Sequence, residues 1–307
     1  MKKAKLIFSI IVLTGLIFFF YKFDSWHLMS KVNGFDFVFL TILTIVIMLF
    51  LGAIFKIEVK IFNIKLAFKH WFGLTMTNTF YNYFMPMRGG LAARAFFMKK
   101  HHDFSYSEYS SMLIGSTLVN FLICAIVACL FSFLLINEIK ESTLFIEYSL
   151  LVFGFTLCLI LFSVLSNKLT SIFKWKFVQK ILNSFNASIK RYVTNKYAFF
   201  LLLALNFTFI FLMSIRLYYV FQILDVQIGF LTILVIRSLV VFSMVISLTP
   251  GNFGISEGII AFLALQSGVD DLDTAILVAT IDRFFSIIVN VIFGVFYHFK
   301  LLRELSM

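Results

Sequence analysis

Long unbroken apolar runs, rather than periodic apolar stripes, dominate the pattern of the chain. A membrane-crossing helix needs about 20 consecutive apolar residues, and six runs approach or exceed that length with few charges. Helices that are apolar on every face are typical of burial in lipid. The pattern therefore predicts an all-α polytopic membrane protein. The six predicted spans are residues 6–23, 35–55, 109–136, 144–165, 197–224 and 274–299.

Two further apolar stretches, residues 66–98 and 228–267, are interrupted by helix-breaking residues. Each contains one of the chain's two prolines, followed by glycines at the same spacing. Proline removes a backbone donor and glycine tolerates non-helical dihedral angles, so we expect both stretches to break there into two short helices. The predicted helix-breaking residues are Pro86, Gly89 and Gly90 in the first stretch and Pro250, Gly251 and Gly254 in the second.

The distribution of Lys and Arg favours hairpins that return to the side they entered from. Cytoplasmic loops of membrane proteins are enriched in these residues. With two re-entrant hairpins, the basic residues in 2–5, 56–69, 99–100, 168–196 and 300–303 all face the cytoplasm. A single crossing of the first stretch would place the most basic loop outside. We therefore predict about six full spans plus two re-entrant broken-helix hairpins in the cytoplasmic (inner) membrane, with both termini cytoplasmic.

The order span, span, hairpin, span occurs twice, in residues 1–140 and 141–307. Each copy makes an odd number of crossings, so the second copy is inverted relative to the first and its hairpin enters from the opposite side. The sequence thus predicts a single transmembrane domain, residues 1–307, built as an inverted repeat whose hairpin tips meet near mid-membrane. Such repeats with broken helices are typical of secondary transporters.

Composition and charge narrow the class of function. Of the 307 residues 61% are hydrophobic and 13% are charged, against roughly 25% charged in an ordinary soluble domain, which excludes a water-soluble enzyme. The net charge of +11 indicates membrane topology and anionic lipid partners rather than nucleic acid. All three cysteines lie inside apolar runs, so we expect neither a disulfide framework nor a metal site, and no cofactor.

The basic loop at residues 168–196 mixes its lysines with large apolar side chains such as Phe173, Trp175 and Phe185. This mixture is typical of an amphipathic helix that lies on a membrane surface. Because the inner leaflet is anionic, we expect the loop to bind membrane lipids there and to anchor the protein.

Charged residues within the predicted membrane region are costly in lipid and mark candidate functional positions. Arg88 lies at the tip of the first hairpin and Arg94 lies one turn into the helix that follows. A helix N-terminus offers free backbone N–H groups to anions, so we expect both arginines, with the backbone at Gly89 and Gly90, to bind a phosphate. The alternative is that Arg88 pairs with a carboxylate of the second half and only holds the hairpins together.

The second half supplies further charged candidates. Glu257 lies three residues after Gly254, where it could cap a helix or carry a proton. Asp282 and Arg283 are adjacent, so they diverge on a helix and each is expected to pair with another helix. Arg216 lies near a helix end and is expected to reach the membrane surface. The candidate substrate-binding residues of this half are Arg237, Asn252, Glu257, Asp282 and Arg283.

Asparagines within the predicted membrane segments add neutral polar groups. Polar side chains in such segments commonly form hydrogen bonds between helices, and this structural role is the one expected for most of them. The residues concerned are Asn78, Asn82, Asn120, Asn206, Asn252 and Asn290.

Both hairpin tips resemble the transmembrane region of the lysylphosphatidylglycerol synthase/flippase family. The stronger match is at residues 250–258, which read Pro-Gly-Asn-Phe-Gly-Ile-Ser-Glu-Gly, in the family's Pro-Gly-x-x-Gly-x-x-Glu-Gly pattern before the last long helix. The first tip departs from the family's form because Leu91 occupies the position of an acidic residue. The role of that carboxylate therefore does not carry over.

The resemblance implies translocation of lipid between leaflets. The family's best understood members resemble flippases for aminoacylated phospholipids, and in those proteins a soluble aminoacyl-transferring domain follows the membrane region. Similar stand-alone proteins accompany cell-envelope polysaccharide and glycolipid pathways. Here the chain ends at Met307 and shows no nucleotide-binding loop or nucleophile elbow, so we expect no enzymatic activity. The expected substrate is an anionic or aminoacylated phospholipid or a polyprenyl-phosphate-linked glycolipid. The alternative function is a non-transporting membrane scaffold or regulator of a cell-envelope lipid or polysaccharide synthesis enzyme.

Overall fold

The computed structural model describes residues 31–85, 88–136, 141–170, 190–246 and 249–306. Over these residues the chain forms α-helices and short 3-10 helices and no strand, which confirms the predicted all-α class. Three predicted features lie outside the described residues: the first span, Pro86 and most of the basic loop.

Five long helices correspond to the other predicted spans, and each contains a segment long and apolar enough to cross a bilayer. Capping boxes start two of them, because the side chains of Asn33 and Ser105 each accept a backbone N–H three residues on. The five helices are α3 (Gly34–Ile61), α6 (Tyr106–Leu134), α7 (Ser142–Thr170), α9 (Lys196–Ile223) and α12 (Leu272–Ser306).

Each of the two interrupted stretches is a pair of short helices. In the first, the ring of His70 near the start of α4 lies 5.3 Å from the ring of His102 at the end of α5, so the two helices run antiparallel. The pairs are α4 (Phe68–Phe84) with α5 (Gly89–His102), and α10 (Phe230–Val240) with α11 (Ile255–Gln266), the latter joined through η2 (Val241–Ile246) and η3 (Pro250–Asn252).

The two breaks differ in their backbone chemistry. In the second hairpin, Gly251 (φ 60°) and Gly254 (φ 82°) adopt the left-handed region that favours glycine, as predicted. In the first hairpin the left-handed residue is Arg88 (φ 54°), whereas Gly89 and Gly90 begin α5. The prediction that these two glycines break the helix is therefore wrong. Gly90 serves close packing instead.

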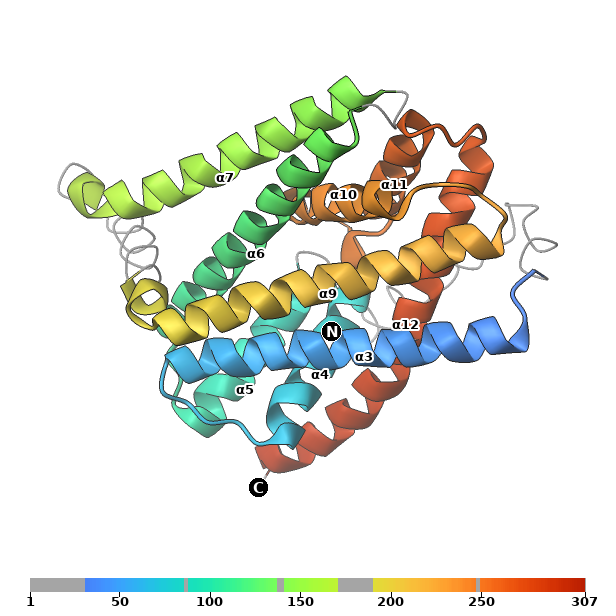
Figure 1. Cartoon of the computed structure of the whole chain (residues 1–307). Coiled ribbons are helices and arrows are strands. Elements are labelled where there is room, and N and C mark those ends of the chain that lie inside the picture. Colours follow the sequence, from blue (N-terminus) through green and yellow to red (C-terminus); the bar gives the residue numbers. More distant parts are fainter. Residues whose placement is uncertain (1–30, 86–87, 137–140, 171–189, 247–248, 307) are drawn as a thin grey trace.

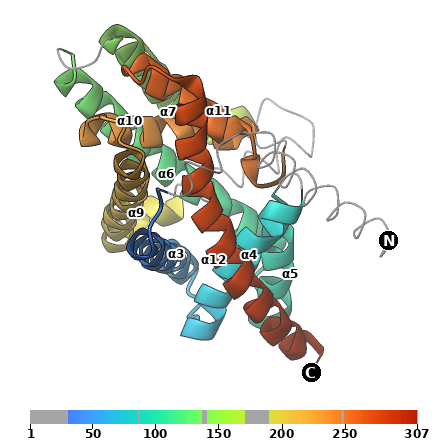
Figure 2. The same cartoon turned by 90° about the vertical axis from the view of Figure 1, so that its right-hand side faces the viewer.

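Two clusters of buried apolar side chains lie at opposite ends of the bundle, and each of them includes one hairpin. The first hairpin packs with the end of α3, the starts of α6 and α9 and the end of α12. The second packs with the start of α3, the ends of α6 and α9 and the starts of α7 and α12. Because each hairpin begins and ends in one cluster, each returns to the side it entered from. Figure 1 shows α9 beside α3, and Figure 2 shows α12 crossing beside α4.

The tips of the two hairpins touch one another. Arg88 at the first tip donates a hydrogen bond from Nη2 to the carbonyl oxygen of Met244 at 3.0 Å. Gly251 at the second tip lies so close to the ring of Tyr83 that a Cβ atom there would overlap it. The predicted approach of the tips is confirmed.

Candidate functional site

A cavity of about 390 Å³ lies between the first hairpin and helices α3, α6, α9 and η2. Arg88 and Arg94 both line it, so the structure brings together the two arginines that the sequence proposed as phosphate ligands. Phe55, Phe121 and Phe209 contribute apolar walls. The cavity thus combines apolar walls with two cations inside a bundle of membrane-crossing helices.

Eight of the remaining lining residues are polar and uncharged. Such groups are costly in lipid unless protein, water or a ligand satisfies them. The Oδ1 atom of Asn78 is buried without a hydrogen-bond partner in the structure. The lining therefore suits a polar guest. Its neutral polar residues are Thr75, Asn78, Thr79, Asn82, Ser116, Thr117, Asn120 and Asn206.

Arg94 is held on one side of its guanidinium group. Its Nε donates to the hydroxyl of Tyr109 at 2.7 Å, and the group stacks 4.2 Å above the ring of Phe55. This hydrogen bond uses Nε, and no hydrogen bond from the described residues involves the two terminal nitrogens, which can therefore bind the two oxygens of a phosphate or carboxylate.

The backbone at the start of α5 is less available than the sequence suggested. The N–H of Gly90 donates to Oδ1 of Asn82 at 3.0 Å. The expectation that this amide is a free anion ligand is therefore corrected, because α4 already supplies its acceptor. Arg88 is the N-cap residue of α5 and links the two tips.

Glu58 is the charged lining residue that sequence reasoning missed. Its side chain lies on α3 and is buried, with 4% of the residue exposed. Its carboxylate lies near the neutral Ser116 and the positively charged Arg94, which line the same cavity. The basic neighbours Lys56 and Lys60 suggested a loop, whereas α3 continues to Ile61. The apolar residues after Glu58 were the signal that could have revealed this extension.

A second polar cluster is centred on Asp282. Arg216 donates from Nε and Nη2 to its two carboxylate oxygens at 2.8 and 3.1 Å, and Arg237 donates from Nη2. Arg216 also donates to the hydroxyl of Thr44. Arg216 is fully buried, with 0% exposure, so the prediction that it reaches the membrane surface is wrong. The two carboxylate oxygens of Asp282 accept hydrogen bonds from Nε and Nη2 of Arg216, and the negative charge of Asp282 balances the positive charge of Arg216.

Glu257 and Arg283 form the neighbouring ion pair, in which Nη1 of Arg283 lies 2.6 Å from Oε1 of Glu257. The other carboxylate oxygen accepts the N–H of Gly254 at 2.7 Å, which confirms the predicted cap. Arg283 also donates to the carbonyl oxygen of Gly251. Adjacent residues Asp282 and Arg283 thus pair with different helices, as expected.

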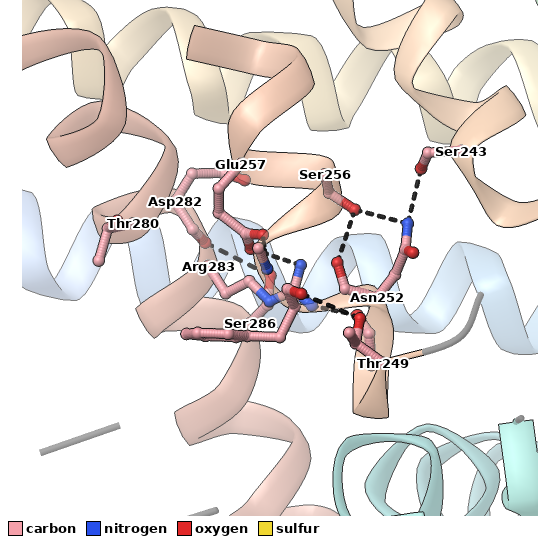
Figure 3. A network of polar contacts seen from close by, with 12 residues as sticks. Ser243, Thr249, Asn252, Ser256, Glu257, Thr280, Asp282, Arg283 and Ser286 are labelled. Carbon is pink, nitrogen blue, oxygen red and sulfur yellow. Dashed lines mark hydrogen bonds and ion pairs between the residues drawn. The ribbon is translucent and has the colours of Figure 1, made fainter. Parts of the chain in front are cut away.

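Asn252 completes this network at the second tip. Its Nδ2 donates to the hydroxyls of Ser243 at 2.6 Å and Ser256 at 2.9 Å, which ties η2 to α11. Figure 3 shows these contacts beside the pair of Glu257 and Arg283.

The predicted single site is therefore divided in space. Arg88 and Arg94 line the cavity, whereas the second-half candidates form a network that is not part of its lining. The carboxylates of that network are neutralised by arginines of their own half, so the cavity keeps its positive charge. The residues of the network are Arg237, Asn252, Glu257, Asp282 and Arg283.

The asparagines play a different part from the one expected for most of them. Asn206 and Asn290 donate to carbonyl oxygens one turn earlier in their own helices, and Asn120 accepts from Cys124 of its own helix. The prediction of hydrogen bonds between helices is wrong for these three, although Asn82 does bond to α5. Since three of the four cavity asparagines bond locally or lack a partner, they contribute polarity to the cavity rather than helix pairing.

These features define a polytopic helical membrane protein with two broken-helix hairpins around an interior polar cavity. Residues 6–294 match the family described as the lysylphosphatidylglycerol synthase TM region, and the chain belongs to that family, whose membrane region is flippase-like. No curated protein and no solved structure matches the chain.

Proposed function

We propose that this protein translocates a lipid with an anionic headgroup between the two leaflets of the membrane. The observation that carries the proposal is the cavity in which Arg88 and Arg94 lie together inside the bundle. The substrate classes that fit are an anionic or aminoacylated phospholipid and a polyprenyl-phosphate-linked glycolipid, because each places a phosphate beside polar groups.

The barrier to lipid translocation is the transfer of the charged headgroup through hydrocarbon. Arginine offers a phosphate two parallel charge-assisted hydrogen bonds, and the asparagine and threonine lining replaces part of the lost hydration. A headgroup in this cavity would exchange water for fixed polar groups. The hydrocarbon chains would remain in the apolar bilayer.

An apolar groove of about 210 Å³ next to the cavity supports this arrangement. It lies between α6 and α7 and is lined by Ile114, Leu118 and Leu159 together with Leu113 and Thr117, which also line the cavity. A lipid whose headgroup occupies the cavity could therefore place part of an acyl or prenyl chain in the groove.

We infer that residues 1–140 and 141–307 act as inverted halves during transport. In this arrangement the ion pairs of Asp282 and Glu257 hold the second hairpin against α12, while the first hairpin borders the cavity. Movement of one tip against the other would expose the cavity to alternate sides. Both termini would be cytoplasmic, and the 168–196 loop would bind the anionic inner leaflet.

Transport in proteoliposomes tests the proposal. Fluorescent phosphatidylglycerol, an aminoacylated phosphatidylglycerol and a short polyprenyl-phosphate sugar are the probes, and an added quencher reports leaflet position. We expect the wild type to move at least one lipid and Arg88→Ala to lose at least tenfold in rate, equivalent to about 1.4 kcal/mol.

The matched control is Lys31→Ala, because Lys31 pairs with Asp225 at the surface and is not part of the cavity lining. It should transport at the wild-type rate. Normal transport by Arg88→Ala would refute the assignment. If folded wild-type protein moves none of the lipids, the scaffold or regulator function replaces transport, and crosslinking would identify the synthesis enzyme it serves.

A further inference from the structure

The cavity holds a carboxylate for which the proposed function gives no role. Glu58 is buried on α3 and lines the cavity beside Ser116 and Arg94. An ionised carboxylate away from bulk water is costly unless it has a counter-charge, and it otherwise binds a proton. The balance between these two states depends on the groups that face it.

Glu58 differs in its partners from the two carboxylates of the second-half network. Asp282 is bound by two arginines, and Glu257 by Arg283 and a backbone N–H. None of the ion pairs formed by the described residues includes Glu58. Its neighbour Ser116 is neutral, and Arg94 acts on it as a nearby charge. Protonation therefore breaks no ion pair at Glu58, in contrast to the other two positions.

The charged and titratable groups that face Glu58 come from three segments. Arg94 lies on α5, Tyr109 lies on α6, and Tyr192 precedes α9. Helices α4 and α9 contribute asparagine and threonine to the lining, and Arg88 lies at the hairpin tip. Arg94 is thus the cation shared between Glu58 and any anion that enters the cavity.

We propose that Glu58 binds a proton when an anionic headgroup binds Arg94, so that lipid and proton are carried together. This inference rests on the proposed function. In the empty cavity, burial favours the protonated carboxyl group, and the charge of Arg94 opposes this by favouring the ionised form. A bound phosphate neutralises that charge and adds a second anion nearby, which favours the protonated carboxyl group. By thermodynamic linkage, protonation of Glu58 strengthens headgroup binding to the same extent.

The proton step is a simple exchange with water. The proton comes from the solution on the side to which the cavity is open, forms an O–H bond with the carboxylate and leaves to the solution on the other side. A phosphodiester headgroup with one negative charge and one proton crosses with no net charge. A pH gradient therefore becomes a driving force for lipid movement.

A pH gradient across proteoliposomes that contain fluorescent phosphatidylglycerol tests the coupling. We expect the wild type to accumulate the probe in the leaflet facing the alkaline side, by up to about tenfold per pH unit for one proton per lipid. Glu58→Gln should still move the probe but distribute it without regard to the gradient. The matched control is Asp36→Asn, a buried carboxylate at the other end of α3 that accepts from Asn33 and Tyr219. It should remain coupled.

Proton uptake in detergent separates this proposal from transport itself. Binding of short-chain phosphatidylglycerol to the wild type should take up about one proton from a weakly buffered solution, and Glu58→Gln should take up none. Lipid movement that ignores the gradient in the wild type overturns the coupling and leaves the proposed function intact. Absence of proton uptake by the wild type overturns it whether or not lipid moves.

Discussion

Asp282 holds two buried arginines that come from different helices, Arg216 of α9 and Arg237 of α10. Their side chains are 1% and 7% exposed, and that of Asp282 is 5% exposed. In such surroundings the pairing energy must offset a large desolvation cost, and removal of one partner leaves uncompensated charge. Asp282 therefore acts first as a structural centre between α12 and two helices of the second half.

Substitution of Asp282 should strongly destabilise the protein. We expect Asp282→Ala to lower the free energy of unfolding by about 3–5 kcal/mol, because two arginines lose their counter-charge. Denaturant titration in detergent measures it. Asp225→Asn is the control, since asparagine tolerates the left-handed backbone of this position (φ 60°) and loss of its surface ion pair with Lys31 should change stability by less than about 1 kcal/mol. Equal effects of the two substitutions would contradict this role.

For single residues, the sequence correctly indicated which charged residues lie inside the protein more often than it indicated the partners with which they pair. Helical divergence of Asp282 and Arg283 correctly indicated separate partners. The burial of Arg216 depends on its pairing with Asp282, which is distant in sequence. Glu58 was missed because the predicted span ended at residue 55, whereas α3 continues to Ile61. The partner of each charged residue is set by how the helices pack against one another. The position of a charge along a single helix therefore could not predict its partner.

Close packing of α5 on α4 gives the first hairpin its shape. A Cβ atom at Gly90 would overlap the carbonyl oxygen of Asn78, and the Gly90 N–H is bound by Asn82. Both contacts position Arg88 and Arg94 on the cavity. The packing of α4 against α5 at Gly90 therefore determines where Arg88 and Arg94 lie in the cavity.

A methyl group at position 90 should disrupt this hairpin. Because backbone cannot rotate away as a side chain can, we expect Gly90→Ala to cost about 1–3 kcal/mol of stability and to reduce lipid transport. Gly258→Ala on α11 is the control, since nothing lies within 4 Å of its added Cβ and alanine favours helix. Thermal unfolding in detergent compares them, and an unperturbed Gly90→Ala protein would show that α4 and α5 separate freely.

The pattern of elements was more predictable than their local chemistry. Long apolar runs specified the spans, and proline with glycine located the second break. The left-handed residue of the first break is Arg88, a residue type that rarely adopts this conformation. Glycine is required at position 90 because α4 packs too closely for a side chain there. The sequence around Gly90 does not reveal this contact.

At the scale of the whole molecule, the two hairpins enter opposite ends of the bundle and meet at their tips. The sequence predicted this arrangement from the Lys and Arg content of the loops. Each loop must lie on one of the two sides of the membrane, so the basic loops determined how many times the chain crosses. The polar cavity on the side of the first hairpin was not predictable as such, since its lining comes from segments spread over residues 51–245. Only packing assembles it.

The central claim is that this cavity is the path of the lipid headgroup, and blocking it is the most direct test. Thr79 lines the cavity and its hydroxyl bonds only to its own helix. In a variant with the three native cysteines replaced, Thr79→Cys should transport lipid until a thiol reagent fills the cavity. Thr208→Cys is the control, because Thr208 makes the same type of bond on α9 outside the cavity lining.

The measurement is the rate of lipid movement in proteoliposomes before and after labelling. The account predicts that labelled Thr79→Cys loses at least nine tenths of its transport, that labelled Thr208→Cys keeps it, and that substrate lipid slows the labelling of Thr79→Cys. Undiminished transport by fully labelled Thr79→Cys protein would contradict the account, because the headgroup would then cross by another route.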